Sequence, residues 1–224
     1  MDVKHVCSFF LIALVSCSSC HAQQRHDFRP VVKITKDDGT SGTGFIVAKD
    51  AGLCEVWTNA HVSGSTGEEV NVRFFNGETV TGKVAWSKLD RSCCFDAAKI
   101  IVSCPNSFVV DPVVIGNSSR THSLGSVDGW PLGRWQVSKP IRKDKKSVSF
   151  GTAYQPVSHG GESGSPVTES DEGKVIGVCT WNLGPSKRPT CSVFQPIEHW
   201  TGESHSVELS FNKNLRPIGR HGDK

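Results

Sequence analysis

Short alternations of apolar and polar residues, separated by turn-forming residues, run through the chain from residue 31 to residue 195. Such alternation places every second side chain on one face, which is typical of β-strands. Asn76-Gly77, between two of these segments, is a strong hairpin signal. The strands expected in the first half are 31–35, 44–48, 55–58, 70–75, 80–86, 97–102 and 109–115. Those expected in the second half are 123–127, 135–138, 148–154, 167–168, 175–181 and 192–195.

The pattern contains almost no helical periodicity. Only residues 197–201 predict a short helix near the C-terminus, because no other segment sustains a 3.6-residue apolar period. Many short strands without intervening helices favour a sandwich or barrels over alternating α/β units. A chain of 224 residues with 37% hydrophobic residues can hold one large all-β unit or two smaller ones. We therefore expect an all-β fold.

The two ends of the chain differ from this pattern. Residues 1–22 contain a basic start, a short apolar run and then small residues, which is the pattern of a secretory signal peptide. Cleavage after Ala22 would make Gln23 the first mature residue, whereas residues 14–17 resemble a bacterial lipobox in which Cys17 would be lipidated. We favour simple cleavage, giving a secreted or periplasmic protein, with membrane attachment only if Cys17 is lipidated. The polar residues 202–224 predict a flexible tail.

Six cysteines remain once the leader is set aside: Cys54, Cys93, Cys94, Cys104, Cys179 and Cys191. An even number of cysteines in an oxidising compartment favours disulfides. We predict the pairs Cys54–Cys104 and Cys179–Cys191, because each pair falls on strands that we expect to be neighbours. No spacing of cysteine and histidine is typical of a zinc site, and we predict no metal and no cofactor.

Charge excludes one class of partner. The formal net charge is +3, which is too small to indicate a nucleic-acid-binding protein. We interpret the one basic cluster as a solvated loop, because neighbouring like charges repel each other into solvent. Its members are Lys139, Arg142, Lys143, Lys145 and Lys146.

Residues 160–167 are the first candidate for chemistry. Ser163 lies in a turn with glycines at positions 161 and 164, which allow a sharp backbone turn and close approach. A serine nucleophile needs such presentation beside a base, together with amides that stabilise the oxyanion formed on attack. The amides of Gly161 and Ser163 are the candidates for that oxyanion hole. The same composition is also common in surface loops without chemistry.

Two further residues complete a possible catalytic set. His61 lies just after the expected strand 55–58, and Asp96 immediately precedes the expected strand 97–102. Histidine, aspartate and serine in this order supply the groups for proton abstraction, orientation of the base and stabilisation of the imidazolium. Asp90 is an alternative carboxylate, but we prefer Asp96 because an apolar strand follows it at once.

These residues resemble a known family. Residues 58–61, 96–98 and 161–166 resemble the histidine, aspartate and serine motifs of chymotrypsin-fold (trypsin-like) serine proteases. Residues 42–45 and 129–133 are similar to bacterial HtrA-type peptidase domains, and residues 165–167 to the glutamyl-endopeptidase group. The resemblance covers residues 31–200.

The resemblance implies a fold and a mechanism. The fold is two six-stranded antiparallel β-barrels side by side with the active site between them, at about 28–115 and 116–201 of a peptidase domain spanning 23–201. His61 would act as general base and then acid, Asp96 as its orienting partner and Ser163 as nucleophile. The implied activity is that of an exported serine endopeptidase with an acyl-enzyme intermediate and a protein or peptide substrate. We expect no PDZ domain after Trp200, and we favour a monomer.

The resemblance also assigns a substrate pocket to six residues: Val157, Ser158, Thr180, Trp181, Asn182 and Ser192. Val157 replaces the acid that gives trypsins their preference for basic residues. The histidine that binds glutamate in glutamyl endopeptidases would fall near Cys179, and His159 is an alternative source of an imidazole. We therefore predict an uncharged pocket that favours small or apolar side chains.

Glu162 occupies the place of the acid that, in the family, pairs with an amine freed by activation cleavage. Here it would form an internal pair, for instance with an arginine, or face solvent. The start of the mature chain at Gln23 carries no activation sequence, so we predict activity without proteolytic activation. The main alternative function is an inactive protease-fold protein used for binding or as a scaffold in the cell envelope. A third is an unrelated β-sandwich adhesion module, in which His61 and Ser163 would lie far apart.

Overall fold

The computed structural model describes residues 27, 29–106, 110–118, 124–170, 172–185, 187–200 and 215–217. The predicted leader at 1–22 lies outside these ranges, as does all of the predicted tail except 215–217. Within the described ranges, no helix has both the length and the apolar character needed to cross a membrane.

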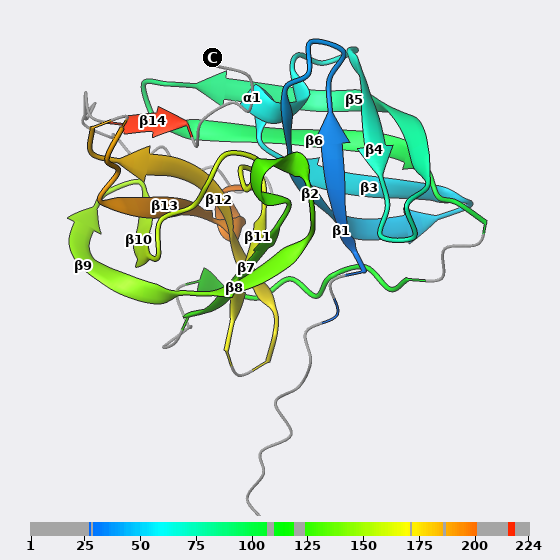
Figure 1. Ribbon diagram of the computed structural model, residues 1–224. Helices are drawn as coiled ribbons and strands as arrows, with labels where there is room; N and C mark the ends of the chain where they lie inside the picture. The colour runs from blue at the N-terminus through cyan, green and yellow to red at the C-terminus, as the bar shows by residue number, and fades with distance from the viewer. Residues whose placement is uncertain are drawn as a thin grey trace, which may run out of the picture.

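The first sheet is a closed antiparallel barrel with strand order β1-β2-β3-β6-β5-β4 (Figure 1). Its strands are β1 (Val31–Thr35), β2 (Ser41–Asp50), β3 (Leu53–Thr58), β4 (Glu69–Arg73), β5 (Thr79–Asp90) and β6 (Phe95–Ser103). Alternate residues such as Ile34, Val56, Val72 and Ile100 are fully buried in its core. The alternation read in the sequence therefore corresponds to an inward and an outward face of each strand.

The second sheet is curled and has eight strands, in the order β8-β7-β11-β12-β13-β10-β9 with β14 paired to β12. The strands are β7 (Leu124–Gly129), β8 (Val137–Pro140), β9 (Arg142–Val148), β10 (Gly151–Gln155), β11 (Pro166–Glu169), β12 (Val175–Leu183), β13 (Cys191–Pro196) and β14 (Leu215–Pro217). The prediction of an all-β fold built from two antiparallel units is confirmed. The second unit differs from a six-stranded barrel by its larger, curled sheet.

The described part of the chain includes three short helical turns with defined bounds. They are the α-helix α1 (Ala60–Ser63) and the 3-10 helices η2 (Pro131–Gly133) and η3 (Ile197–Trp200). The predicted C-terminal helix at 197–201 is confirmed by η3.

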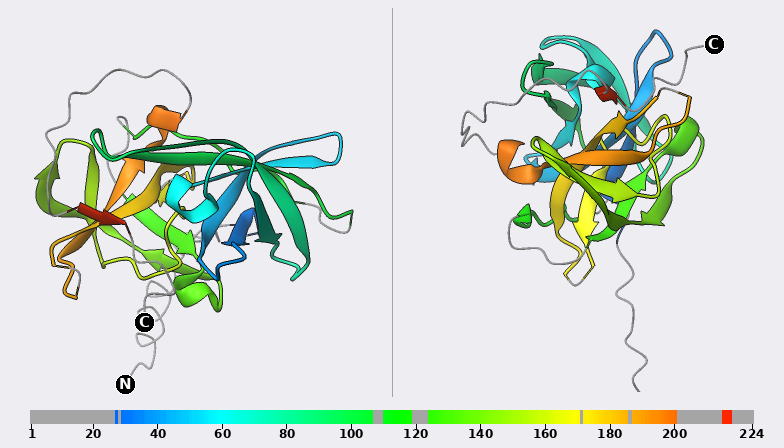
Figure 2. Two further views of the ribbon diagram at one scale, coloured as in Figure 1. Left: turned by 90° about the horizontal axis from the view of Figure 1, so that it is seen from above. Right: turned by 90° about the vertical axis from the view of Figure 1, so that its left-hand side faces the viewer.

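The two sheets lie side by side (Figure 2), and they share a hydrophobic cluster. Phe45 and Trp57 of the first sheet pack in this cluster with Val178 of the second sheet and Trp200 of η3. The rings of Trp57 and Trp200 stack with their centroids 5.8 Å apart. Such burial fixes the relative position of the two sheets, which matters because the candidate residues come from both of them.

Several predicted strands were wrong in detail. Of the segment 109–115, the described residues form no strand and only a single bridge, between Ile115 and Val175. The predicted strand 148–154 contains the turn between β9 and β10. The basic cluster is also not a loop, because four of its members lie on β9 and Lys139 lies on β8.

One of the two predicted disulfides is confirmed, and the other is wrong. The pair Cys54–Cys104 is present, with a Cα–Cα distance of 5.4 Å. The pair Cys179–Cys191 was wrong, since both thiols are free. Their strands are neighbours as expected, but the register places Cys179 opposite Phe194 and Cys191 opposite Leu183. The two cysteines are therefore too far apart along the strand pair to form a disulfide.

Loss of the Cys54–Cys104 disulfide is expected to lower the free energy of unfolding. The bridge joins residues 50 positions apart, for which the loop-closure model gives about 4 kcal/mol. Guanidinium unfolding of a Cys54→Ala/Cys104→Ala variant measures this, with Cys93→Ala, at a free cysteine, as the control. An unchanged midpoint in the double variant would contradict the prediction.

Candidate active site

The turn that carries Ser163 depends on two glycines. Gly161 and Gly164 have φ angles of +91° and +83°, a conformation that side chains rarely adopt. A Cβ atom on Gly161 would lie 2.3 Å from the carbonyl oxygen of Trp130, and one on Gly164 would lie 2.1 Å from that of Thr43. The local sequence therefore forms this turn only with glycine at both positions.

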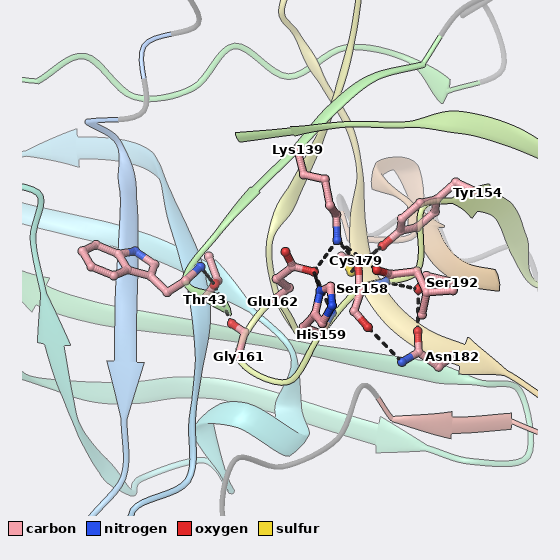
Figure 3. Close-up of polar contacts among 12 residues, drawn as sticks. Thr43, Lys139, Tyr154, Ser158, His159, Gly161, Glu162, Cys179, Asn182 and Ser192 are labelled. Atoms are coloured by element: carbon pink, nitrogen blue, oxygen red, sulfur yellow. Dashed lines mark hydrogen bonds and ion pairs between the residues drawn. The ribbon is translucent and has the colours of Figure 1, made fainter. Parts of the chain in front are cut away.

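Thr43 of β2 ties the turn to the first sheet. Its amide donates to the carbonyl oxygen of Ser163 at 2.8 Å, and its hydroxyl donates to that of Gly161 at 2.8 Å. The same hydroxyl accepts from the amide of Trp130 at 3.0 Å. Figure 3 shows Thr43 and Gly161 in contact. The motif at residues 42–45 thus has a physical role, which is to hold the serine turn against the neighbouring barrel.

His61, Asp96 and Ser163 meet where the two sheets join. The Ser163 hydroxyl lies 2.5 Å from Nε2 of His61. Nδ1 of His61 contacts Oδ2 of Asp96, and the His61 amide donates to Oδ1 of Asp96 at 3.1 Å. The three residues are buried, with exposed fractions of 8% for His61, 0% for Asp96 and 2% for Ser163. The structure therefore brings all three predicted side chains into one hydrogen-bonded chain.

The alternative carboxylate, Asp90, lies elsewhere. It accepts from the amide of Ser92 at 2.9 Å and from its hydroxyl, in the turn after β5. These bonds lower the pKa of Asp90, the hydroxyl bond most. Its carboxylate is thus part of an exposed turn.

Asn59 is a site residue that the sequence did not single out. Its Oδ1 atom lies 3.2 Å from the Ser163 hydroxyl. Its Nδ2 atom donates to the carbonyl oxygen of Asp96 at 2.8 Å and to the hydroxyl of Thr180 at 3.1 Å. Asn59 therefore connects the serine, the aspartate strand and β12. Its place two residues before His61, at the start of α1, was the available signal.

Two backbone amides in the serine turn have no hydrogen-bond acceptor among the described residues. They belong to Gly161 and Ser163, whereas the amide of Glu162 between them donates to the carbonyl oxygen of His159 at 3.1 Å. Amides without acceptors next to a nucleophile are the groups that an oxyanion hole needs.

Three of the six predicted pocket residues, Ser158, Asn182 and Ser192, form one polar network (Figure 3). The Ser158 amide donates to the Ser192 hydroxyl at 2.7 Å, and that hydroxyl donates to Oδ1 of Asn182 at 2.5 Å. Nδ2 of Asn182 donates to the carbonyl oxygen of Ser158 at 3.3 Å. The indole of Trp181 lies 6.4 Å, centroid to centroid, from the His61 ring. The charged side chain that reaches these residues is Lys139, whose Nζ lies 3.5 Å from the Ser158 hydroxyl.

Tyr154 and Cys179, in the core of the second sheet, are hydrogen-bonded to Ser158 of this network. The Tyr154 hydroxyl lies 2.6 Å from the Ser158 hydroxyl and 2.7 Å from the Cys179 sulfur. Burial raises the pKa of the Cys179 thiol to about 12, so the thiol stays protonated at neutral pH. Within the described ranges, no group of three or more His, Cys, Asp or Glu is arranged to hold a metal ion.

Glu162 forms a buried ion pair, and its partner is a lysine. Its carboxylate is 1% exposed and lies 2.5 Å from Nζ of Lys139. It also accepts from the His159 amide at 2.8 Å, and Lys139 donates to the carbonyl oxygen of Val157 at 3.2 Å. The expectation of an internal pair is thus met, but by Lys139 of β8 in place of an arginine. His159 itself is largely exposed, with a side-chain exposure of 67%.

Comparisons with solved structures identify the class of fold. The chain superposes on an HtrA-type protease, AlgW with tripeptide, at TM-score 0.60 and 19% identity, over 77% of this chain and 58% of that one. The serine endoprotease from Yersinia pestis gives 0.60 at 20% identity, over 79% and 62%. Rv3671c from M. tuberculosis H37Rv, in an inactive form, gives 0.58 at 22% identity, over 79% and 86%.

The fold is therefore that of the trypsin-like domain of HtrA-type proteases. The chain spans about three fifths of the length of the two HtrA-type structures. No family model matches the sequence, and no curated protein matches it.

Proposed function

We propose that this protein is a serine endopeptidase that hydrolyses peptide bonds through His61, Asp96 and Ser163. The single observation that carries the proposal is the continuous chain from the Ser163 hydroxyl through His61 to Asp96, with a Ser163–His61 distance of 2.5 Å. This is the arrangement that a base needs to remove the hydroxyl proton. The trypsin-like fold supports the same assignment.

The residues divide the chemistry among them. His61 Nε2 takes the proton from Ser163 as the serine oxygen bonds to the carbonyl carbon of the substrate. The carbonyl electron pair moves onto oxygen, where the amides of Gly161 and Ser163 would stabilise it. The imidazolium then gives its proton to the leaving amine, forming the acyl-enzyme. Water repeats the sequence, with His61 again as base, and releases Ser163.

Labelling with a fluorophosphonate tests the proposal. We expect the reagent to modify Ser163, identified by mass spectrometry, and not to modify Ser163→Ala or His61→Ala. Ser165→Ala is the matched control, because the Ser165 hydroxyl is buried two residues away and has no hydrogen-bond partner among the described residues. A correctly folded chain that is not labelled would instead indicate an inactive binding or scaffold protein.

The substrate pocket is expected to accept small or apolar side chains. Asn182 and Ser192 bond to each other and to the Ser158 backbone, while the Lys139 ammonium that reaches the Ser158 hydroxyl is paired with Glu162. Among the described pocket residues, the one charge that reaches them is thus already neutralised by Glu162, and we expect it not to select arginine, lysine or glutamate. Cleavage of a peptide library, read by mass spectrometry, measures this preference. Dominant cleavage after any of those three residues would contradict it.

We also propose that the enzyme acts outside the cytoplasm, either secreted or in a periplasm. The Cys54–Cys104 disulfide supports this location, since such bonds persist in oxidising compartments. Mass spectrometry of the N-terminus of the exported protein distinguishes a start at Gln23 from a lipidated Cys17.

A further inference from the structure

Strand β12 leaves part of one edge uncovered beside the serine turn. On one side, β13 pairs with β12 as far as Leu183. On the other side, β11 pairs only from Val175 to Val178. The chain preceding β11 then turns away through Ser163, and the last contacts there are two bonds of 2.9 Å between Cys179 and the residues Gly164 and Ser165. Residues 181–183 therefore present an edge that β11 does not reach.

Strand β14 occupies this edge. It pairs antiparallel with β12, with Leu215 opposite Leu183, Arg216 opposite Asn182 and Pro217 opposite Trp181 (Figure 1). These three residues belong to the polar tail that the sequence predicted to be flexible. Proline is confined to edge strands because it cannot donate to a ladder, and Pro217 is in such a strand.

The covered edge adjoins the candidate site. Thr180, one residue before the paired segment, accepts a hydrogen bond from Asn59, whose side chain also contacts Ser163. The ring of Trp181 lies 6.4 Å from that of His61. Since the pairing is antiparallel, the chain in β14 runs from Leu183 toward Trp181, which is toward the serine turn.

We propose that β14 is an internal competitor for peptide substrates. An extended peptide binds to a free sheet edge through main-chain hydrogen bonds, and Asn182 and Leu183 form such an edge beside Ser163. The tail segment 215–217 fills it in the manner of a bound peptide. This inference rests on the proposed peptidase function, and it adds an autoinhibitory role for the C-terminal segment.

The expected size of the effect follows from tethering. A segment on a short linker acts at an effective concentration of about 1 mM. Against a dissociation constant on the order of 0.1 mM, it would occupy the edge about nine tenths of the time. Release of β14 should then raise kcat/KM for an extended substrate about tenfold and leave kcat unchanged.

The substitution Arg216→Pro tests this in the full-length chain, because it removes the amide of the central β14 residue. Hydrolysis of fluorescein-labelled casein is expected to rise about tenfold at low substrate concentration. A synthetic peptide of residues 213–219, added to this variant, should restore the inhibition competitively. Glu208→Pro, in the same tail but outside β14, is the control and should behave like the unchanged chain.

A second readout separates failure of this inference from failure of the proposed function. Hydrogen exchange of the Asn182 amide, which faces β14 because Leu183 bonds on the β13 side, should be faster when Arg216→Pro is added on a Ser163→Ala background. If the fluorophosphonate labels Ser163 but casein rates and exchange are the same with and without Arg216→Pro, the inference is wrong and the peptidase proposal stands. If exchange rises but no chain is labelled or hydrolyses casein, both the competitive role and the proposed function are wrong.

Discussion

Replacement of Ser163 by alanine is expected to lower the rate of peptide hydrolysis by on the order of a millionfold, as in other enzymes of this mechanism. The reason is that Ser163 supplies the only atom that bonds to the substrate, and His61 has no proton to remove without it. The measurement is the hydrolysis of fluorescein-labelled casein by purified variants of equal stability. Ser165→Ala, at the neighbouring buried hydroxyl, should retain the activity of the unchanged chain.

Substitutions of His61 and Asp96 are expected to lower the activity by different amounts. His61→Ala should cost about as much as Ser163→Ala, and the double variant should be no slower, because the two act as one unit. Asp96→Asn should cost about 10⁴-fold, since asparagine holds the imidazole in the wrong tautomer. Asp90→Asn, at the end of β5, should have little effect, because its carboxylate bonds to Ser92 and not to His61. Losses in Ser163→Ala and His61→Ala that multiplied in the double variant would contradict a shared role.

The site was predictable where it depends on short local patterns. The alternation of 31–35 gave β1 with its observed bounds, and Asn76-Gly77 marked the turn between β4 and β5. Gly77 has a φ of +89°, which explains that signal. His61, Asp96 and Ser163 were found because each stands next to a strand end or a glycine turn that positions it. The resemblance to the family motifs then supplied the expectation that they meet.

The rest depended on register, which a single sequence does not reveal. The five residues of the basic cluster had the same signal in the sequence. The pairing of β8 with β7 nevertheless places Lys139, alone among them, against the buried Glu162 carboxylate. Cys179 and Cys191 were on neighbouring strands as predicted, but the register of β12 and β13 separates them. Strand β14 has only three residues in a polar tail, so no periodicity could have shown it.

The buried pair of Lys139 and Glu162 should dominate the stability of the serine turn. Lys139→Met would leave the Glu162 carboxylate, which is 1% exposed, without its cation. Breaking a buried pair in this way costs about 3 kcal/mol. Urea unfolding measures the loss, and Lys145→Met, at an exposed residue of β9, is the matched control.

The double variant Lys139→Met/Glu162→Gln tests whether the ion pair only stabilises the fold or also positions the nucleophile Ser163. Because glutamine carries no charge to bury, the double variant should regain most of the stability lost in Lys139→Met. The His159 amide and the Val157 carbonyl would still lose their charged partners. The turn that holds Gly161 and Ser163 should then be less ordered. We expect fluorophosphonate labelling of Ser163 to be about tenfold slower than in the unchanged chain. This factor corresponds to about 1.4 kcal/mol, the free energy of one weakened charge-assisted hydrogen bond. Equal labelling rates in a double variant of restored stability would mean that the pair stabilises the fold without positioning the nucleophile.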